Sequence, residues 1–166
     1  SYTVTQTVTQ GACTDVNSIT VVVYNEPTTS LVITDASCNG GCDGAIDLTV
    51  NSGQAPYNFS WDSGQSSEDI TGLCTGTYNV TITDANSCTT TASGTVNEPT
   101  VLSTTPSGNN ASCFGLCDGD ATAGPSGGSP PYTYSWDDPL LQTTSTALGL
   151  CAGTFNVTVT DNNGCN

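Results

Sequence analysis

Hydrophobic and polar side chains alternate over several short stretches of this chain. Large residues occupy every second position in residues 57–61 and 132–136, and aliphatic residues do so in residues 46–50. Period two is that of a β-strand with one buried face, and no stretch carries the period of an amphipathic helix. Turn sequences such as Gly-Gly, Asp-Gly and Asn-Asn-Gly separate the stretches. The pattern predicts an all-β protein.

The largest side chains in these stretches are aromatic, and each group shares one face of its predicted strand. Period two places Tyr57, Phe59 and Trp61 together, and the same spacing recurs in residues 132–136. Such alternation beside a Pro-Tyr pair favours a buried core over the alternative, a surface platform that stacks on sugar rings. The predicted core residues are Trp61, Trp136, Tyr57, Tyr132, Tyr78 and Phe155.

The strands belong to a repeat that four cysteines mark in register. Two spacings of 75 residues and two of 77 residues relate the cysteines of one unit to those of the next. Matching aromatic residues accompany them, so the repeat signal is strong. The equivalent cysteines are Cys38 and Cys113, Cys42 and Cys117, Cys74 and Cys151, and Cys88 and Cys165.

Asn-Glu-Pro tripeptides at residues 25–27 and 97–99 mark the boundaries between units. Proline fixes its own φ and restricts the preceding residue, which makes a short and fairly stiff joint. We expect a C-terminal hairpin of a preceding domain (1–27), a complete repeat (28–99) and a second repeat that lacks its last strand (100–166). About seven short strands in each unit predict tandem small immunoglobulin-like β-sandwich repeats, stapled by disulfides.

Composition narrows the functions that the chain can have. The 166 residues include no Lys, Arg, His or Met, and the formal charge is −15. Nucleic acid is excluded as a partner because no basic patch exists, and no apolar run is long enough for direct membrane insertion. The sequence has no initiator Met and no signal peptide, so we expect it to be a segment of a longer precursor.

Nine cysteines in this length indicate disulfides formed outside the cytoplasm. Metal clusters usually mix Cys with His or contain tight Cys-x-x-Cys pairs, and neither occurs here. In an immunoglobulin-like strand order, the turn between strands A and B and the turn before strand F lie at the same end of the sandwich. This order predicts two bridges within the repeats, Cys42 with Cys74 and Cys117 with Cys151.

The remaining cysteines are expected to link neighbouring domains. Cys38 follows strand A, whereas Cys88 lies in the F–G turn at the opposite end of the same unit. A strand of about seven residues separates them by roughly 20 Å, while a disulfide needs Cα atoms within about 7 Å. Cys38 is therefore predicted to bond to Cys165, across the joint at Pro99. By the same reasoning, Cys13 and Cys88 are expected to bond to upstream domains, and Cys113 to a downstream domain.

Taken together, the motifs resemble a known family. The pattern C-x-G-x-x-D-G, then P-Y-x-x-S-W, then G-T-[YF]-N-V-T-x-T-D and a closing Cys resembles the SprB-type repeat of Bacteroidota cell-surface proteins. Residues 2–27 resemble the end of a PKD-like domain from the same proteins. The resemblance implies a very large modular protein exported by the type IX secretion system, related to adhesins of gliding motility. The family has no established catalytic residues, so the resemblance implies none in this chain.

Acidic turn residues are the only candidates for a metal site or for catalysis. Oxygen-rich turns suit Ca²⁺, although ordinary turn chemistry explains them equally well and none matches the spacing of a calcium loop. Paired carboxylates serve glycosidases, but with no His, Lys or Arg we expect no enzyme activity. The calcium candidates are Asp43, Asp84, Asp118, Asp120 and Asp161.

Two functions remain for an extracellular protein of the cell surface. The first is an extended adhesive stalk or fibre, and the second is a self-assembling filament or sheath. Copies in a filament would be joined by inter-domain disulfides or by strand addition, with residues 12–24 completing the unfinished repeat. The expected partners are neighbouring repeats of the same chain, copies of the chain in a fibre, and surface polysaccharide.

Overall fold

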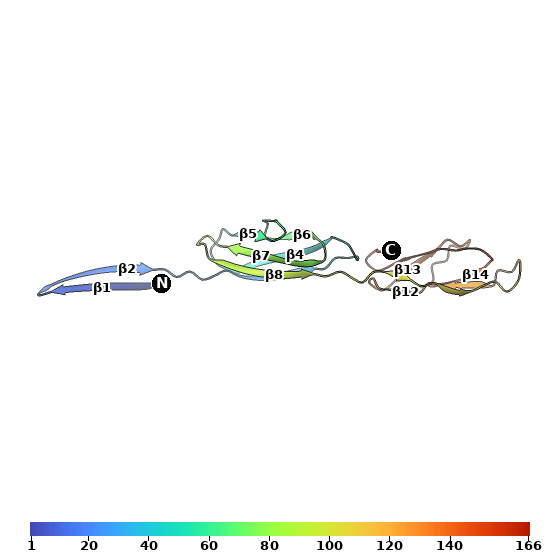
Figure 1. Cartoon of the computed structure of the whole chain (residues 1–166), viewed down its shortest axis with the longest axis horizontal. Helices are drawn as coiled ribbons and strands as arrows, with labels where there is room; N and C mark the ends of the chain where they lie inside the picture. Colours follow the sequence, from blue (N-terminus) through green and yellow to red (C-terminus); the bar gives the residue numbers. More distant parts are fainter. The chain divides into compact units, whose positions relative to one another are not determined.

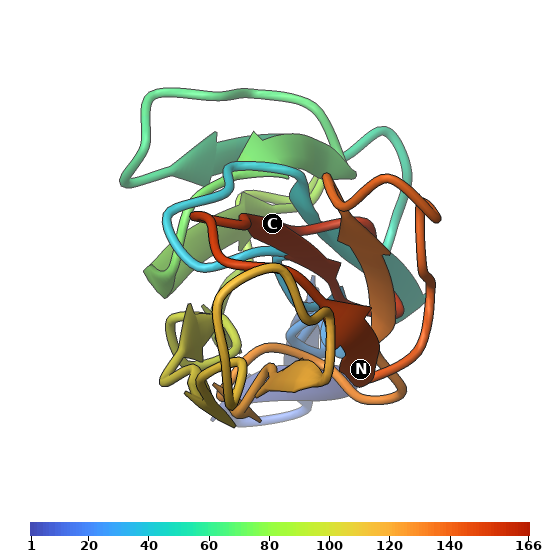
Figure 2. The same ribbon diagram turned by 90° about the vertical axis from the view of Figure 1, so that its right-hand side faces the viewer.

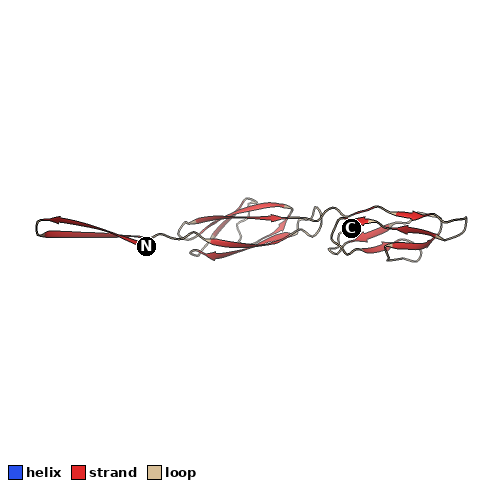
Figure 3. Ribbon diagram, turned by 90° about the horizontal axis from the view of Figure 1, so that it is seen from below, coloured by secondary structure: helices blue, strands red, loops and turns tan.

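A computed structural model describes the backbone of residues 1–166 and every side chain except that of Tyr2. The chain consists of strands and loops, and the described residues contain no helix (Figure 3). The all-β prediction is therefore confirmed. The chain divides into two compact units. One contains residues 1–31, 48–68 and 79–93, and the other contains residues 32–47, 69–78 and 94–166.

The first element is a two-stranded hairpin of β1 (Tyr2–Gln10) and β2 (Cys13–Val21) (Figure 1). The strands pair in register, with Gln10 opposite Cys13, and Gly11 in the two-residue turn has a φ of 63°. Such turns favour glycine because a side chain is strained at positive φ. The apolar side chains of Val4, Val8 and Ile19 are more than half exposed. The hairpin thus buries little core of its own.

The first repeat has six strands arranged in two three-stranded sheets (Figure 1). The order within one sheet is β3-β4-β6 and within the other β5-β7-β8. Lettered A, B, C, E, F and G, these sheets are A-B-E and C-F-G, which is immunoglobulin-like topology without strand D. The strands are β3 (Thr28–Thr34), β4 (Gly44–Ser52), β5 (Asn58–Trp61), β6 (Ile70–Leu73), β7 (Gly76–Thr83) and β8 (Thr89–Val96).

Two glycines mark where the sheets of the first repeat approach each other closely. A methyl group added at Gly94 in β8 would lie 2.9 Å from Cδ1 of Ile46 in β4. One added at Gly44 in β4 would lie 2.6 Å from Cγ1 of Val96 in β8. Position 44 needs glycine, because an added Cβ would also lie 2.9 Å from the carbonyl oxygen of Leu73, whereas the flexible end of Ile46 can shift to admit a Cβ at Gly94. The fully buried side chains of the first repeat include Ile46, Leu48, Val80, Ile82 and Val96, whereas Val50 in β4 and Tyr78 in β7 are half-buried.

The second repeat follows the same order with shorter strands, coloured yellow to red in Figure 2. Its sheets are β10-β11-β14, β9-β12 and β13-β15. Pro106 and Pro125 stand where the first repeat has Leu31 and Val50. Pro106 lies at the break in strand A and Pro125 is the first residue after the break in strand B, since proline donates no ladder hydrogen bond. The strands are β9 (Ser103–Thr104), β10 (Ser107–Asn109), β11 (Gly119–Thr122), β12 (Pro125–Ser126), β13 (Thr133–Trp136), β14 (Thr146–Leu150) and β15 (Val157–Thr160).

The predicted core aromatics divide into two groups by burial. Trp61 and Trp136 are each 3% exposed, and each indole N–H donates a 2.9 Å hydrogen bond to a backbone oxygen. In the second repeat Trp136 packs in a cluster with Ala123, Ala147, Leu150 and Val159. The other four aromatics are only half-buried at the margins of the sandwiches, and these are Tyr57, Tyr78, Tyr132 and Phe155.

The half-buried tyrosines keep their hydroxyl groups at the surface, where they can form hydrogen bonds. Tyr78 Oη donates to the carbonyl of Cys74 at 2.9 Å, and Tyr132 Oη donates to that of Gly127 at 2.6 Å. The first contact closes the turn before strand F, as the tyrosine corner does in other immunoglobulin-like domains. Phe155 replaces Tyr78 in the second repeat and has no hydroxyl group for this contact.

Candidate functional site

Two disulfides lie within the repeats and join equivalent turns. Cys42 bonds to Cys74 and Cys117 bonds to Cys151, at sequence separations of 32 and 34 residues. Each bridge connects the turn between strands A and B to the turn before strand F. These are the pairs that the immunoglobulin-like order leads one to expect. Since the separations are nearly equal, the two repeats share one stapling scheme.

A third disulfide joins the first repeat to the second, between Cys38 and Cys165. The Cα atoms are 5.8 Å apart, within the usual range for a disulfide. Cys38 lies in the A–B turn of the first repeat, and Cys165 lies in the F–G turn of the second. The pairing is the one expected from the opposite positions of Cys38 and Cys88 in a sandwich. Its sequence separation of 127 residues spans the Asn-Glu-Pro joint.

Hydrogen bonds surround this bridge and involve both turns and the joint. Asn163 Nδ2 donates to the carbonyl of Ser37 at 2.8 Å. Asn39 Nδ2 donates to the carbonyl of Pro99 at 3.1 Å, and the N–H of Gly40 donates to a carboxylate oxygen of Glu98 at 2.6 Å. The disulfide is thus one part of a polar junction in which the Glu-Pro of the joint binds the A–B turn.

A buried aspartate builds the F–G turn that presents Cys165. Asp161 is 5% exposed, and its Oδ1 accepts the N–H groups of Asn163 and Cys165, both at 2.9 Å. The N–H of Ser129 donates to Oδ2 at 2.8 Å. The Ser129 hydrogen bond lowers the pKa of Asp161 most, burial opposes it, and the turn N–H groups lower it further. The carboxylate therefore stays ionised and fixes the turn.

Asp84 builds the equivalent turn in the first repeat with the same contacts. Its Oδ1 accepts the N–H groups of Asn86 at 2.8 Å and Cys88 at 2.9 Å, and its Oδ2 accepts that of Gln54 at 3.2 Å. Burial alone would raise the pKa of Asp84, but the hydrogen bonds from Cys88, Gln54 and Asn86 outweigh it and lower that pKa. The two F–G turns therefore share one geometry.

Other candidate calcium ligands are also engaged in turns. Asp43 and Asp118 cap the A–B turns, where their Oδ1 atoms accept the N–H groups of Ser37 at 2.9 Å and Ser112 at 2.8 Å. Asp120 accepts a hydrogen bond from the side chain of Asn109. No group of three or more His, Cys, Asp or Glu side chains suited to a metal occurs in the described part of the chain. The five aspartates are not brought together.

The lowered aspartate pKa values make stability depend on pH. A carboxyl group whose pKa is lower in the folded state stabilises the fold above its unfolded pKa, about 3.9, and loses this contribution as pH falls through the folded value. We expect the melting temperature to fall when pH is lowered from 6 to 3, and to fall less in Asp161→Asn. A rise of the melting temperature over this range, from relief of the −15 charge, would contradict the expectation.

Three cysteines remain free, and two of them sit at repeat ends. Cys88 lies half-buried in the F–G turn of the first repeat, and Cys113 is exposed in the A–B turn of the second. Cys13 is exposed beside the turn of the hairpin. Burial first, and then the nearby Asp84 and Glu26 carboxylates, raise the pKa of the Cys88 thiol. Free thiols therefore occur at positions equivalent to the bridged Cys165 and Cys38.

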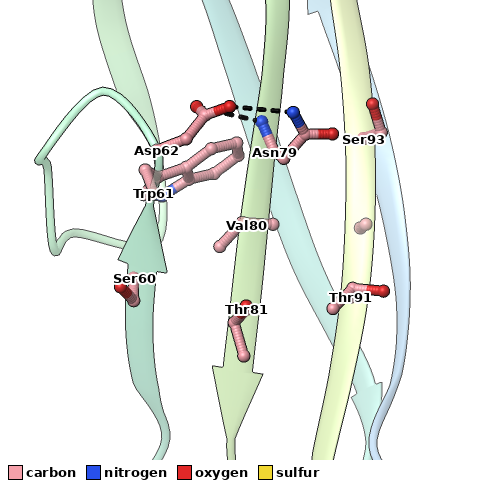
Figure 4. A pocket seen from close by; sticks show the side chains of 9 residues that line it. Ser60, Trp61, Asp62, Asn79, Val80, Thr81, Thr91 and Ser93 are labelled. Carbon is pink, nitrogen blue, oxygen red and sulfur yellow. Dashed lines mark hydrogen bonds between the residues drawn. The ribbon is translucent and has the colours of Figure 1, made fainter.

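A polar groove lies on the C-F-G sheet of the first repeat, with a volume of about 410 Å³ (Figure 4). Asp62 Oδ1 accepts the N–H of Asn79 at 3.1 Å and Oδ2 accepts its Nδ2 at 2.8 Å, which ties strand C to strand F. Asp137 and Asn156 make the same pair of contacts in the second repeat. The ring of Trp61 lies beside this groove but is 3% exposed, so it offers no open face for stacking on a sugar.

These Asp–Asn pairs and the Glu98 contact were missed in reasoning from the sequence. A signal was present, because Asp follows Ser-Trp in both repeats and Asn follows the aromatic residue of strand F in both. Equivalent positions in an internal repeat are candidates for one shared contact. The Glu of the Asn-Glu-Pro joint recurs in the same way, at Glu26 and Glu98.

Comparison with known families shows a similarity in both repeats. The SprB repeat model matches the chain twice, over residues 30–66 and 105–141. SprB repeats are typical of cell-surface, adhesin-like proteins. The matches begin in strand A of each sandwich and continue past the tryptophan of strand C. These two segments of the chain are therefore similar to SprB repeats.

No curated protein matches this chain. The described residues contain no helix that is long and apolar enough to cross a lipid bilayer.

Proposed function

We propose that this chain is a tension-bearing region of a secreted cell-surface adhesin, in which disulfides across the joints lock successive SprB repeats into a stalk or fibre. The proposal assigns the chain no catalytic role. Its direct partners are the neighbouring repeats, and the adhesive contact with a surface or its polysaccharide is made by the larger protein. The family match and the cross-joint disulfide support this function.

The Cys38–Cys165 bridge carries the proposal because of its place in the covalent structure. A pulling force applied to the two chain ends passes from Cys38 directly to Cys165 through the disulfide. The sequence separation of 127 residues between these cysteines, at about 3.5 Å per extended residue, represents roughly 440 Å of chain that force cannot release. A bridge of this span limits extension even when both repeats unfold, which suits a fibre under tension.

Single-molecule stretching of the chain between residues 1 and 166 tests the proposal. The oxidised chain should release none of the roughly 440 Å enclosed by the bridge, and the fully reduced chain should release all of it. Cys38→Ser/Cys165→Ser should release only about 210 Å, because the other two bridges still enclose 32 and 34 of those 127 residues. An oxidised wild-type chain that already extends as far as this variant would refute the proposal.

A second candidate function is a filament joined by strand addition at β15, which the groove beside this strand favours. A groove of about 320 Å³ lies beside β15 and is lined by Leu102, Val157 and Val159 among others. Residues 12–24 are not a spare strand for this edge, because β2 already pairs with β1 along its length.

A peptide of residues 89–99, which contains β8, tests strand addition in trans. If the edge accepts such a strand, the peptide should raise the melting temperature of the second repeat. The control peptide carries Val96→Asp, because Val96 is fully buried in the first repeat and a carboxylate would not enter that position. Equal effects of the two peptides, or no effect of either, would remove this second candidate.

A further inference from the structure

The joint at Cys38–Cys165 consists of two kinds of turn, and both kinds occur a second time with a free thiol. An A–B turn supplies Cys38 and an F–G turn supplies Cys165. The chain has one more A–B turn, which carries Cys113, and one more F–G turn within a repeat, which carries Cys88. The bonded pair therefore serves as an internal reference for the two free cysteines.

The A–B turn of Cys113 keeps the geometry of its bonded counterpart. The N–H of Leu116 donates to the carbonyl of Cys113 at 3.1 Å, as the N–H of Gly41 does to that of Cys38 at 2.9 Å. Ser112 and Asp118 form the same cap as Ser37 and Asp43. The backbone that presents the sulfur of Cys38 to another repeat is thus reproduced at Cys113.

The F–G turn of Cys88 also matches its bonded counterpart. Its N–H binds Oδ1 of Asp84 at 2.9 Å, as that of Cys165 binds Oδ1 of Asp161 at 2.9 Å. Glu26 of the upstream joint lies close enough to influence the Cys88 thiol electrostatically. Glu26 is the equivalent of Glu98, which binds the A–B turn at the bonded joint. Cys88 therefore has both an F–G turn like that of Cys165 and a nearby joint glutamate, as at the bonded joint.

The surface around Cys113 carries apolar groups that the bonded joint lacks. Phe114 is fully exposed and Leu116 is 49% exposed, where the first repeat has Asn39 and Gly41. A groove of about 780 Å³ adjoins Cys113 and Phe114. Contact with another domain would cover these exposed apolar side chains beside the free thiol.

We propose that Cys113 and Cys88 are complementary halves of further cross-joint disulfides, in which Cys113 bonds to the F–G turn cysteine of another SprB-type repeat and Cys88 bonds to an A–B turn cysteine. The partner is a repeat of this same kind, and a second copy of the chain supplies both halves. The inference rests on the proposed function, because it extends the joint seen at Cys38–Cys165 to neighbouring repeats.

Bond formation requires an oxidant, and a small-molecule disulfide such as oxidised glutathione supplies it. The thiolate of Cys113 attacks this disulfide, which gives a mixed disulfide and releases one glutathione thiol. The thiolate of Cys88 from another copy then attacks the Cys113 sulfur and releases the second thiol. Two protein thiols lose two protons and two electrons in total, and one glutathione disulfide becomes two thiols.

The test uses two full-length variants in a Cys13→Ser background, so that each has one free thiol. Cys88→Ser retains Cys113, and Cys113→Ser retains Cys88. In a glutathione redox buffer, an equimolar mixture should form a Cys113–Cys88 heterodimer about tenfold over either homodimer. Random thiol pairing would give only about a twofold excess. The products are quantified by non-reducing electrophoresis and intact-mass measurement.

A heterodimer excess of about twofold, or no covalent dimer, would overturn the inference. Each variant is also checked for the Cys38–Cys165 bridge by peptide mapping. If this bridge is present and the heterodimer is not enriched, the inference fails while the proposed function stands. If the bridge is absent, the proposed function fails, and the inference fails with it because its reference joint does not exist.

Discussion

Replacing Trp61 by Ala should destabilise the first repeat by about 3–5 kcal/mol, as truncation of a large core aromatic generally does. Trp61 is 3% exposed, and its indole N–H satisfies the carbonyl of Ser67. The substitution removes both the packing and the hydrogen-bond donor. Urea denaturation followed by circular dichroism measures the loss, and Trp136 fluorescence reports on the second repeat in the same sample.

Two comparisons make the Trp61 result specific. Trp61→Phe keeps a ring in the core and should lose less stability than Trp61→Ala. Trp136→Ala should affect the second repeat by a similar amount, because Trp136 is equally buried and bonds to the carbonyl of Thr144. An unchanged melting temperature together with lost binding to a glycan would show that the tryptophan serves as a sugar platform instead of a core residue.

Removing the bridge within the first repeat should have an effect of similar size. The Cys42–Cys74 disulfide closes a loop with a sequence separation of 32 residues, which stabilises by about 3–4 kcal/mol in the chain-entropy model. We expect Cys42→Ser/Cys74→Ser to reduce the stability of the first repeat by this amount. Small domains have a total stability of about 5–15 kcal/mol, so the repeat should lose a large share of its stability and unfold at a lower temperature.

The repeat supplies a matched control for this prediction. Cys117→Ser/Cys151→Ser removes the equivalent bridge and should destabilise the second repeat alone. Cys13→Ser changes a free, exposed thiol and should leave both transitions unchanged. Equal stability of the double variant and the wild type, with the Cys38–Cys165 bridge intact, would show that the bridge does not stabilise the sandwich.

Local sequence periodicity predicted the strands because the sheets have one buried face. Ile46 and Leu48 are buried at alternate positions of β4, and Val80 and Ile82 at alternate positions of β7. Apolar residues also alternate in β1, but there Val4 and Val8 are exposed. Period two reports that a strand has an apolar face, but it carries no information about which element covers that face.

Burial of the tyrosines and the number of strands were harder to predict. The aromatic trio of strand C is half-buried at Tyr57 and buried at Trp61, because a small sandwich covers its centre better than its margins. Six strands form the first repeat where seven were expected, since residues 62–69 make a short loop in place of strand D. Loops of this kind have no periodic signal in the sequence.

The candidate site was largely predictable from topology and spacing. Cys38 and Cys88 lie at opposite ends of a strand that is longer than a disulfide can span. Cys88 was therefore ruled out as the partner of Cys38, and Cys165 was predicted instead. Polar contacts at the joint, such as Gly40 with Glu98, were not predictable. This contact depends on how the A–B turn and the joint segment of the first repeat, 58 residues apart in sequence, come together in the fold, which neither segment encodes alone.

A disulfide map of the non-reduced chain tests the central claim, that Cys38 bonds to Cys165, most directly. After alkylation of free thiols and cleavage at Asp and Glu, residues 36–43 contain Cys38 and Cys42, and residues 162–166 contain Cys165. The predicted product is a three-peptide cluster of residues 36–43, 70–84 and 162–166, with Cys88 alkylated in residues 85–98. A cluster that contains residues 85–98 in place of 162–166 would contradict the cross-joint bridge and the function built on it.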